Sequence, residues 1–132
     1  MKKKNRSTFY ITINTNSAQK AMKLALQNAF EDFYDNVTDF VKYTKSNIRK
    51  LNDDDEVDCE SAIEIGEKFH RIHLHALLSF VHGSHIQLDV DKMRSYFSTM
   101  IDDGNIYLQV THVKDNISKL RDYIEKTKNK NN

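Results

Sequence analysis

The spacing of apolar residues divides the chain into strand-like and helix-like segments. Residues 8–15 alternate apolar with polar side chains and are rich in β-branched and aromatic types, which predicts a strand with one buried face. Residues 17–51 contain neither glycine nor proline and repeat apolar residues at three- and four-residue steps. This pattern predicts one long helix, or two helices in line that meet near Asp35, with Ser17 as the N-cap.

The second half of the chain returns to alternation. Residues 62–65 and 69–81 alternate on either side of a turn that begins at Gly66, which predicts a β-hairpin after a polar loop. A helix over 89–101, a strand over 106–113 and a final helix to about residue 128 follow. The order of these elements predicts an α+β fold in one domain, residues 1–132, with a central antiparallel sheet of about five strands flanked by helices.

Two histidines on the second strand of the hairpin are the first candidates for chemistry. His73 and His75 are two residues apart, so they lie on one face of a strand. If the turn centres between residues 68 and 69, Glu64 lies directly across from His73 and faces away from the apolar side of its strand. Glu67 has the opposite parity and reaches the same site only through a bulge, so it is the second choice.

These residue types favour a metal site. Cys59 is the only cysteine, so a metal would be held by histidine and carboxylate side chains. Two imidazoles and one carboxylate suit a divalent ion such as Mn²⁺ or Mg²⁺ and leave positions open for a substrate oxygen. A surface strand with polar side chains turned outward is the alternative interpretation of the same two histidines.

Composition adds little about partners. A net charge of +1 gives no general argument for nucleic acid. No apolar run approaches the length of a membrane span, and the basic start of the chain lacks the apolar stretch of a signal peptide. No membrane partner is therefore expected, and the protein is expected to act inside a cell.

A tyrosine and a lysine on the final helix form the second candidate group. Tyr123 and Lys126 are three residues apart, so they share one helical face. A lysine beside a tyrosine lowers the cost of forming a phenolate and stabilises the charge of a phosphoryl-transfer transition state. The same spacing also occurs on ordinary amphipathic helices, with the tyrosine ring packed and the lysine in solvent.

Taken together, the segments resemble the HUH endonuclease domains of rolling-circle replication initiators, the Rep proteins of circular single-stranded DNA viruses. Three stretches in the expected order carry the resemblance: 9–15 (FYITINT), 73–78 (HLHALL) and 122–126 (DYIEK). They are similar to the family's aromatic first motif, its metal motif and its Tyr-x-x-Lys motif. The resemblance implies an RRM-like or ferredoxin-like HUH fold.

The resemblance also implies a function. A divalent cation, Mn²⁺ or Mg²⁺, would be held by His73, His75 and Glu64 or Glu67, and Tyr123 would attack a phosphate of single-stranded DNA with Lys126 beside it. The expected substrate is a replication origin, in a stem-loop, with Thr12 and Asn14 as DNA contacts. The expected partners are a helicase domain or host replication proteins. The expected location is the host nucleus for a eukaryotic virus and the cytoplasm otherwise.

Three alternatives belong to other classes. Histidine-triad nucleotide hydrolases require a third alternating histidine, but position 77 is Leu77. A binding module would hold single-stranded RNA or DNA on exposed aromatic residues such as Phe9 or Tyr10 without cutting it. A single-tyrosine transposase would share the chemistry of the initiators.

Overall fold

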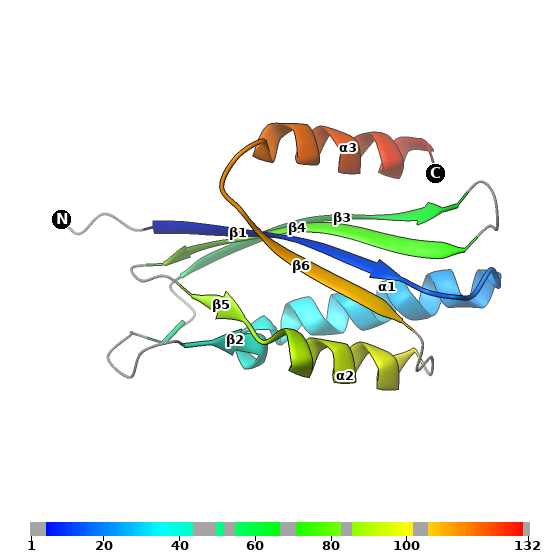
Figure 1. Ribbon diagram of the computed structural model, residues 1–132, viewed down its shortest axis with the longest axis horizontal. Helices are drawn as coiled ribbons and strands as arrows, with labels where there is room; N and C mark the ends of the chain where they lie inside the picture. The colour runs from blue at the N-terminus through cyan, green and yellow to red at the C-terminus, as the bar shows by residue number, and fades with distance from the viewer. Residues whose placement is uncertain are drawn as a thin grey trace.

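Four antiparallel strands form the central sheet of the computed structural model, in the order β3-β4-β1-β6 (Figure 1). The structure describes residues 5–43, 50–51, 55–66, 71–82, 86–101 and 106–130. The four strands are β1 (Asn5–Asn14), β3 (Glu56–Ile65), β4 (Ile72–His82) and β6 (Tyr107–Val113). The other elements are α1 (Lys20–Asp35), the 3₁₀ helix η1 (Val37–Phe40), α2 (Val90–Met100), α3 (Ile117–Lys130) and a two-stranded sheet of β2 (Val41–Lys42) and β5 (Gln87–Leu88).

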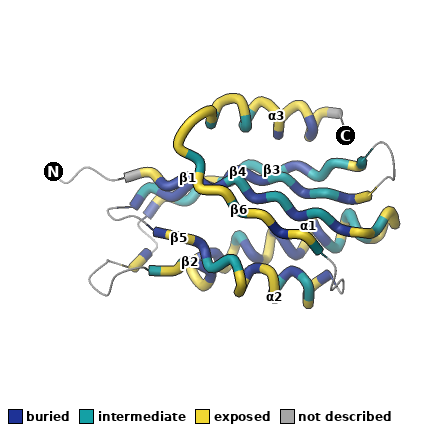
Figure 2. Tube along the Cα trace, viewed as in Figure 1, coloured by how far each residue is buried: buried dark blue, intermediate teal, exposed yellow. Residues whose placement is uncertain are grey.

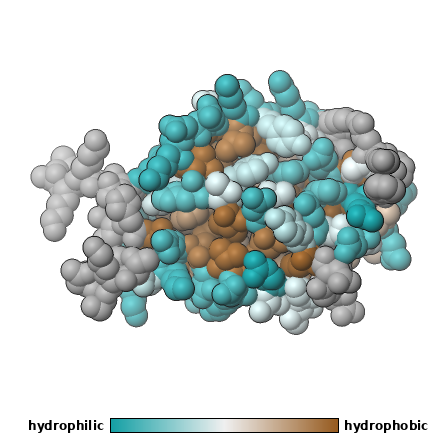
Figure 3. All heavy atoms as spheres, viewed as in Figure 1, coloured by the Kyte–Doolittle hydropathy of each residue, from teal (hydrophilic) through white to brown (hydrophobic). Residues whose placement is uncertain are grey.

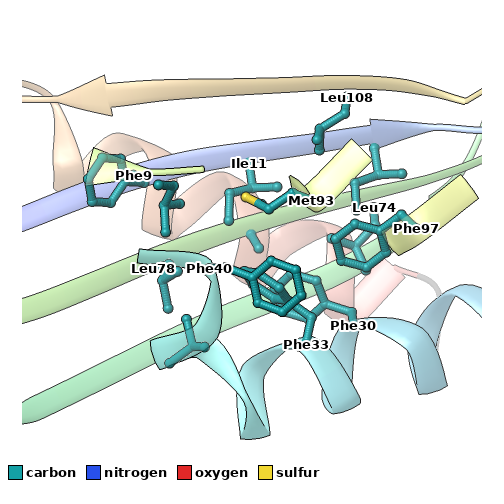
Figure 4. Close-up of a cluster of buried hydrophobic side chains, with 14 of the residues drawn as sticks. Phe9, Ile11, Phe30, Phe33, Phe40, Leu74, Leu78, Met93, Phe97 and Leu108 are labelled. Carbon is teal, nitrogen blue, oxygen red and sulfur yellow. The ribbon is translucent and has the colours of Figure 1, made fainter. Parts of the chain in front are cut away.

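The helices lie on both faces of the sheet. Helices α1 and α2 cover one face, and α3 lies on the other (Figure 1). Alternation along β1 turns Phe9, Ile11 and Ile13 toward α1 and α2, where each is at most 3% exposed. They pack with phenylalanines from the helices, among them Phe33 and Phe97 (Figure 4). This layer is the main hydrophobic core of the protein.

A smaller apolar cluster attaches α3 to the opposite face. Ile124 of α3 is 1% exposed and packs with Ala62 of β3 and Leu77 of β4. Outside this contact α3 is largely exposed (Figure 2). In the space-filling view, hydrophobic side chains gather between α3 and the two helices of the other layer, with hydrophilic side chains outside them (Figure 3). The position of α3 therefore depends on this small cluster, against which Ile117 and Leu120 are also partly buried, rather than on the main core.

Ile124→Ala should loosen α3 selectively. Removing a buried isoleucine side chain costs about 2 kcal/mol or more, and the lost contacts belong to α3 rather than to the main core. Amide hydrogen exchange within α3 should speed up by roughly 30-fold, the equivalent of about 2 kcal/mol, while exchange in α1 stays unchanged. Equal acceleration in both helices would show that α3 is part of the global folding unit.

The α+β class and the antiparallel sheet flanked by helices are confirmed, with four strands in the main sheet and two in the small one. The predicted break near Asp35 agrees with the structure, but the prediction that α-helix continues beyond it was wrong, since a 3₁₀ helix and a strand occupy 37–42. Helix α1 ends at Asp35, where the backbone N–H of Asn36 donates to the carbonyls of Asp32 and Phe33. The following turn buries Phe40, and β2 then pairs with β5. The burial of Phe40 and the pairing of β2 with β5 therefore override the helical spacing of apolar residues after Asp35.

Two further boundaries differ from the predictions. The residue before the first turn of α1 is Gln19, and the Ser17 hydroxyl accepts a hydrogen bond from the Gln19 N–H at 3.2 Å rather than capping the helix. Strand β3 begins at Glu56, inside the predicted loop, because β4 continues far enough to pair with it. In the described part of the chain, none of the helices has the length and apolar character of a membrane span.

Candidate active site

The face of the sheet that carries α3 has polar residues from all four strands. One row runs straight across the sheet in strand order: Glu64 on β3, His73 on β4, Asn14 on β1 and Tyr107 on β6. The pairing of Ile65 with Ile72 centres the hairpin between residues 68 and 69, as expected from the alternation. Glu64 is therefore on the same face as His73. Glu67 lies outside the described residues.

His75 is hydrogen-bonded through both ring nitrogens. Its Nε2 lies 2.9 Å from Oε2 of Glu64, and its Nδ1 lies 3.0 Å from the hydroxyl of Tyr10. A carboxylate only accepts hydrogen bonds, so Nε2 carries a proton in this arrangement, and in the neutral ring Nδ1 accepts from Tyr10. The side chain of His75 is 12% exposed and that of Glu64 is 37% exposed. The His75–Glu64 pair is therefore partly exposed to solvent.

Tyr123 brings the last helix into the same group. Its hydroxyl donates to Oε2 of Glu64 at 3.1 Å, and its ring meets that of His75 edge-on with centroids 5.5 Å apart. Burial raises the pKa of Tyr123, and the hydrogen bond to Glu64 raises it further, so the side chain is a neutral phenol at neutral pH. One carboxylate oxygen therefore connects the tyrosine to the imidazole.

The packing of α3 sets the position of Tyr123. The next residue, Ile124, is buried against the sheet, which leaves Tyr123 43% exposed at the rim. One turn earlier, Nε of Arg121 lies 3.3 Å from Oε1 of Glu60 on β3. The apolar contact and the ion pair both fix α3 to β3, the strand that carries Glu64.

His73 is suited to bind a metal in its neutral form. Burial lowers its pKa most, and the nearby Glu64 opposes part of that effect. A side chain added at Gly66 would approach Nε2 of His73 to 3.5 Å. This is an ordinary van der Waals distance, so Gly66 lies beside the imidazole but is not required there for steric reasons.

The donor atoms of His73, His75 and Glu64 suit a divalent cation, although the three side chains do not form a complete ligand set in this structure. Within the described ranges, no three His, Cys, Asp or Glu side chains form a complete metal-binding group. Nε2 of His75 and Oε2 of Glu64 are 2.9 Å apart, and adjacent ligands of an octahedral ion with bonds of about 2.1 Å are about 3 Å apart. His73 lies across from Glu64 on the same face. These three residues are the ones that would hold the ion.

Tyr10→Phe should weaken metal binding without disturbing the fold. With a metal on Nε2 of His75, the ring proton must sit on Nδ1, where the Tyr10 oxygen can accept it and so keep the ring oriented. We expect Mn²⁺ affinity, measured by titration calorimetry, to fall by about tenfold or more. Tyr34→Phe is the matched control, since the hydroxyl of Tyr34 donates to the backbone carbonyl of Val57 and does not contact the His75–Glu64 pair. Equal affinities in both variants would contradict a role for Tyr10.

The remaining predicted site residues lie around this group. Lys126 is exposed one turn beyond Tyr123 on α3. Thr12 is paired across the sheet with His75, and Asn14 with His73; both are partly buried. The structure therefore places both predicted DNA contacts beside the histidines.

The aromatic residues of the first strand differ from the expectation. Phe9 is 3% exposed in the main core, so it cannot serve as an exposed stacking platform. Tyr10 faces the site but its hydroxyl is engaged with His75. Tyr107, 60% exposed on β6, is an aromatic residue that the sequence had not indicated as a stacking platform. Its alternation with the buried Leu108 was the signal that could have found it.

No family model matches the chain, and no curated protein matches it. Among solved structures, the chain is similar to the crystal structure of the hypothetical protein ORF119 from Sulfolobus islandicus rod-shaped virus 1. The two share 17% identity with a TM-score of 0.48, over 92% of this chain and 83% of that chain. A similarity of this size carries no argument about function.

Proposed function

We propose that the protein is a metal-dependent enzyme that cuts and rejoins single-stranded DNA through a tyrosine nucleophile. More specifically, we propose an HUH endonuclease of the kind that initiates rolling-circle replication at an origin. The observation that carries the proposal is the convergence of Tyr123, Glu64 and His75, in which one carboxylate oxygen contacts both the phenol and the imidazole. An ordinary surface strand of outward polar residues would not require a tyrosine from a distant helix to meet them.

The proposed reaction exchanges one phosphodiester bond for another. The oxygen of Tyr123 forms a bond to phosphorus, and the bond from phosphorus to the 3′-oxygen breaks. The phenolic proton leaves toward Glu64, which already accepts it as a hydrogen bond, and a proton is returned to the 3′-oxygen. The products are a 5′-phosphotyrosine and a free 3′-hydroxyl. Reversal of these steps joins DNA ends without an energy source.

The other side chains would stabilise the reacting phosphate. A bound divalent cation would supply Lewis-acid polarisation of the scissile phosphate. His73 and His75 would hold that cation with Glu64, whose two oxygens allow it to bind a cation and keep its contact with Tyr123. Lys126 would add positive charge one turn along α3.

A pool of random single-stranded oligonucleotides tests the proposal. With Mn²⁺ present, a label on the 3′ end should become covalently attached to the protein on a denaturing gel, because the downstream fragment carries the 5′-phosphate. A label on the 5′ end should appear only in a shortened free strand. Chelation of the metal should remove both products. Absence of any adduct across the pool in both Mn²⁺ and Mg²⁺ would reject the endonuclease.

A second function is a module that binds single-stranded nucleic acid without cutting it. The observation in its favour is the exposed Tyr107 on the same face of the sheet as the polar site. Retention of the oligonucleotides with no covalent product in either metal would identify this function instead.

A further inference from the structure

Part of the polar face of the sheet lies beyond the main contacts of α3. Helix α3 packs on β3 and, less extensively, on β4. Strand β6 is the edge strand at the opposite end of the sheet from β3, and much of it is exposed (Figures 1 and 2). Alternation turns Tyr107, Gln109 and Thr111 of β6 to this face, beside Thr12 and Asn14 of β1. All five side chains are neutral, so none of them repels a phosphate backbone.

Tyr107 is the prominent member of this open area. Its side chain is 60% exposed, although the neighbouring Leu108 shows that β6 has a buried face available for apolar residues. Tyrosine combines a flat ring that stacks on bases with a hydroxyl that tolerates water. Core packing therefore does not account for this ring.

Asn14, directly opposite Tyr107, has unused hydrogen-bonding capacity. Its Oδ1 is inaccessible to solvent and finds no hydrogen-bond partner among the described residues. Buried polar atoms are nearly always paired, because leaving one unpaired is costly. A hydrogen-bond donor of a molecule bound beside Tyr107 would supply the missing partner.

We propose that Tyr107 is a stacking platform for a base of single-stranded DNA next to the phosphate that is cut, with Asn14 and Gln109 contacting the edge of that base. Tyr107 and His73 are separated by two strand spacings in one row, about 10 Å. A strand whose phosphate lies at Tyr123 and His73 can therefore place a neighbouring base on Tyr107. The assignment of DNA as the ligand rests on the proposed function.

The test measures binding apart from cleavage. All proteins carry Tyr123→Phe and are studied with chelator present, against oligonucleotides with 2-aminopurine at successive positions, whose fluorescence is quenched by stacking. Tyr107→Ser should weaken binding roughly 5- to 100-fold, the usual range for losing one base–aromatic stack, and should abolish quenching at one position. Tyr107→Phe should keep both. Leu24→Ser on α1, where Leu24 is 61% exposed, is the matched control and should change neither.

The outcomes distinguish failure of the Tyr107 stacking proposal from failure of the endonuclease proposal. Unchanged binding and quenching in Tyr107→Ser would overturn the stacking assignment, and so would an equal loss in Tyr107→Phe, which keeps the ring. Either result leaves the endonuclease intact if the wild-type protein forms its covalent adduct. Stacking that depends on Tyr107 in a protein that never forms an adduct would retain the platform and reject the enzyme.

Discussion

Tyr123→Phe is expected to abolish the covalent protein–DNA adduct, with a loss in cleavage rate of at least about 10⁴-fold, as for removal of other enzymatic nucleophiles. The substitution deletes only the oxygen that would bond to phosphorus. The ring stays at the rim of α3, and Ile124 still anchors the helix. Single-stranded DNA binding and thermal stability should therefore stay close to those of the wild-type protein. Adduct formation on a denaturing gel, followed over time with a 3′-labelled strand, is the measurement.

Tyr10→Phe is the sharpest control for this experiment. Tyr10 and Tyr123 both have hydroxyls in contact with the His75–Glu64 pair, so only the nucleophile should be indispensable once manganese is saturating. Tyr96 lies on α2, with its hydroxyl bonded to Asp32 on the other side of the sheet. An adduct that persists in Tyr123→Phe would assign the attack to another tyrosine, and Tyr10 and Tyr107 would be examined first.

Glu64→Gln is expected to have the second largest effect, a loss of metal-dependent cleavage of at least about a hundredfold. The amide keeps the shape of the side chain and its oxygen can still accept from His75. It removes the negative charge that would attract a cation and the basic oxygen that accepts the phenolic proton of Tyr123. Mn²⁺ affinity should fall together with the rate. Calorimetry and single-turnover cleavage measure the two effects separately.

Two other glutamates complete this comparison. Glu56→Gln removes an exposed charge from the far end of the same strand and should leave both quantities unchanged. Glu67→Gln should keep most of the activity, because strand alternation assigns the carboxylate to Glu64. An inactive Glu67→Gln beside an active Glu64→Gln would transfer the ligand role to Glu67 while keeping the endonuclease.

The hairpin was predictable because its register depends on local alternation. The apolar residues Ile63, Ile72 and Leu74 must lie on the face of the sheet that is buried in the core. A shift of the pairing by one residue would turn His73 and His75 into that core. The pairing of Glu64 with His73 follows from this requirement. The break near Asp35 was one of the two alternatives that the sequence offered, but the strand after it was not predictable in the same way, because the apolar spacing continues while β2 pairs with a strand from a distant part of the chain.

The sequence by itself determined the α+β class, the antiparallel hairpin and the shared face of His73, His75 and Glu64, because alternation and turn position act between near neighbours. Only the tertiary structure decided that Tyr123 meets Glu64, a residue 59 positions away, and that Tyr10 supports His75 while Phe9 is buried. It also left Tyr107 on an uncovered part of the sheet. These arrangements depend on the position of α3, on the pairing of β1 with β4 and on the helices that cover the other face. All three are set by contacts between segments far apart in the chain, which local periodicity does not encode.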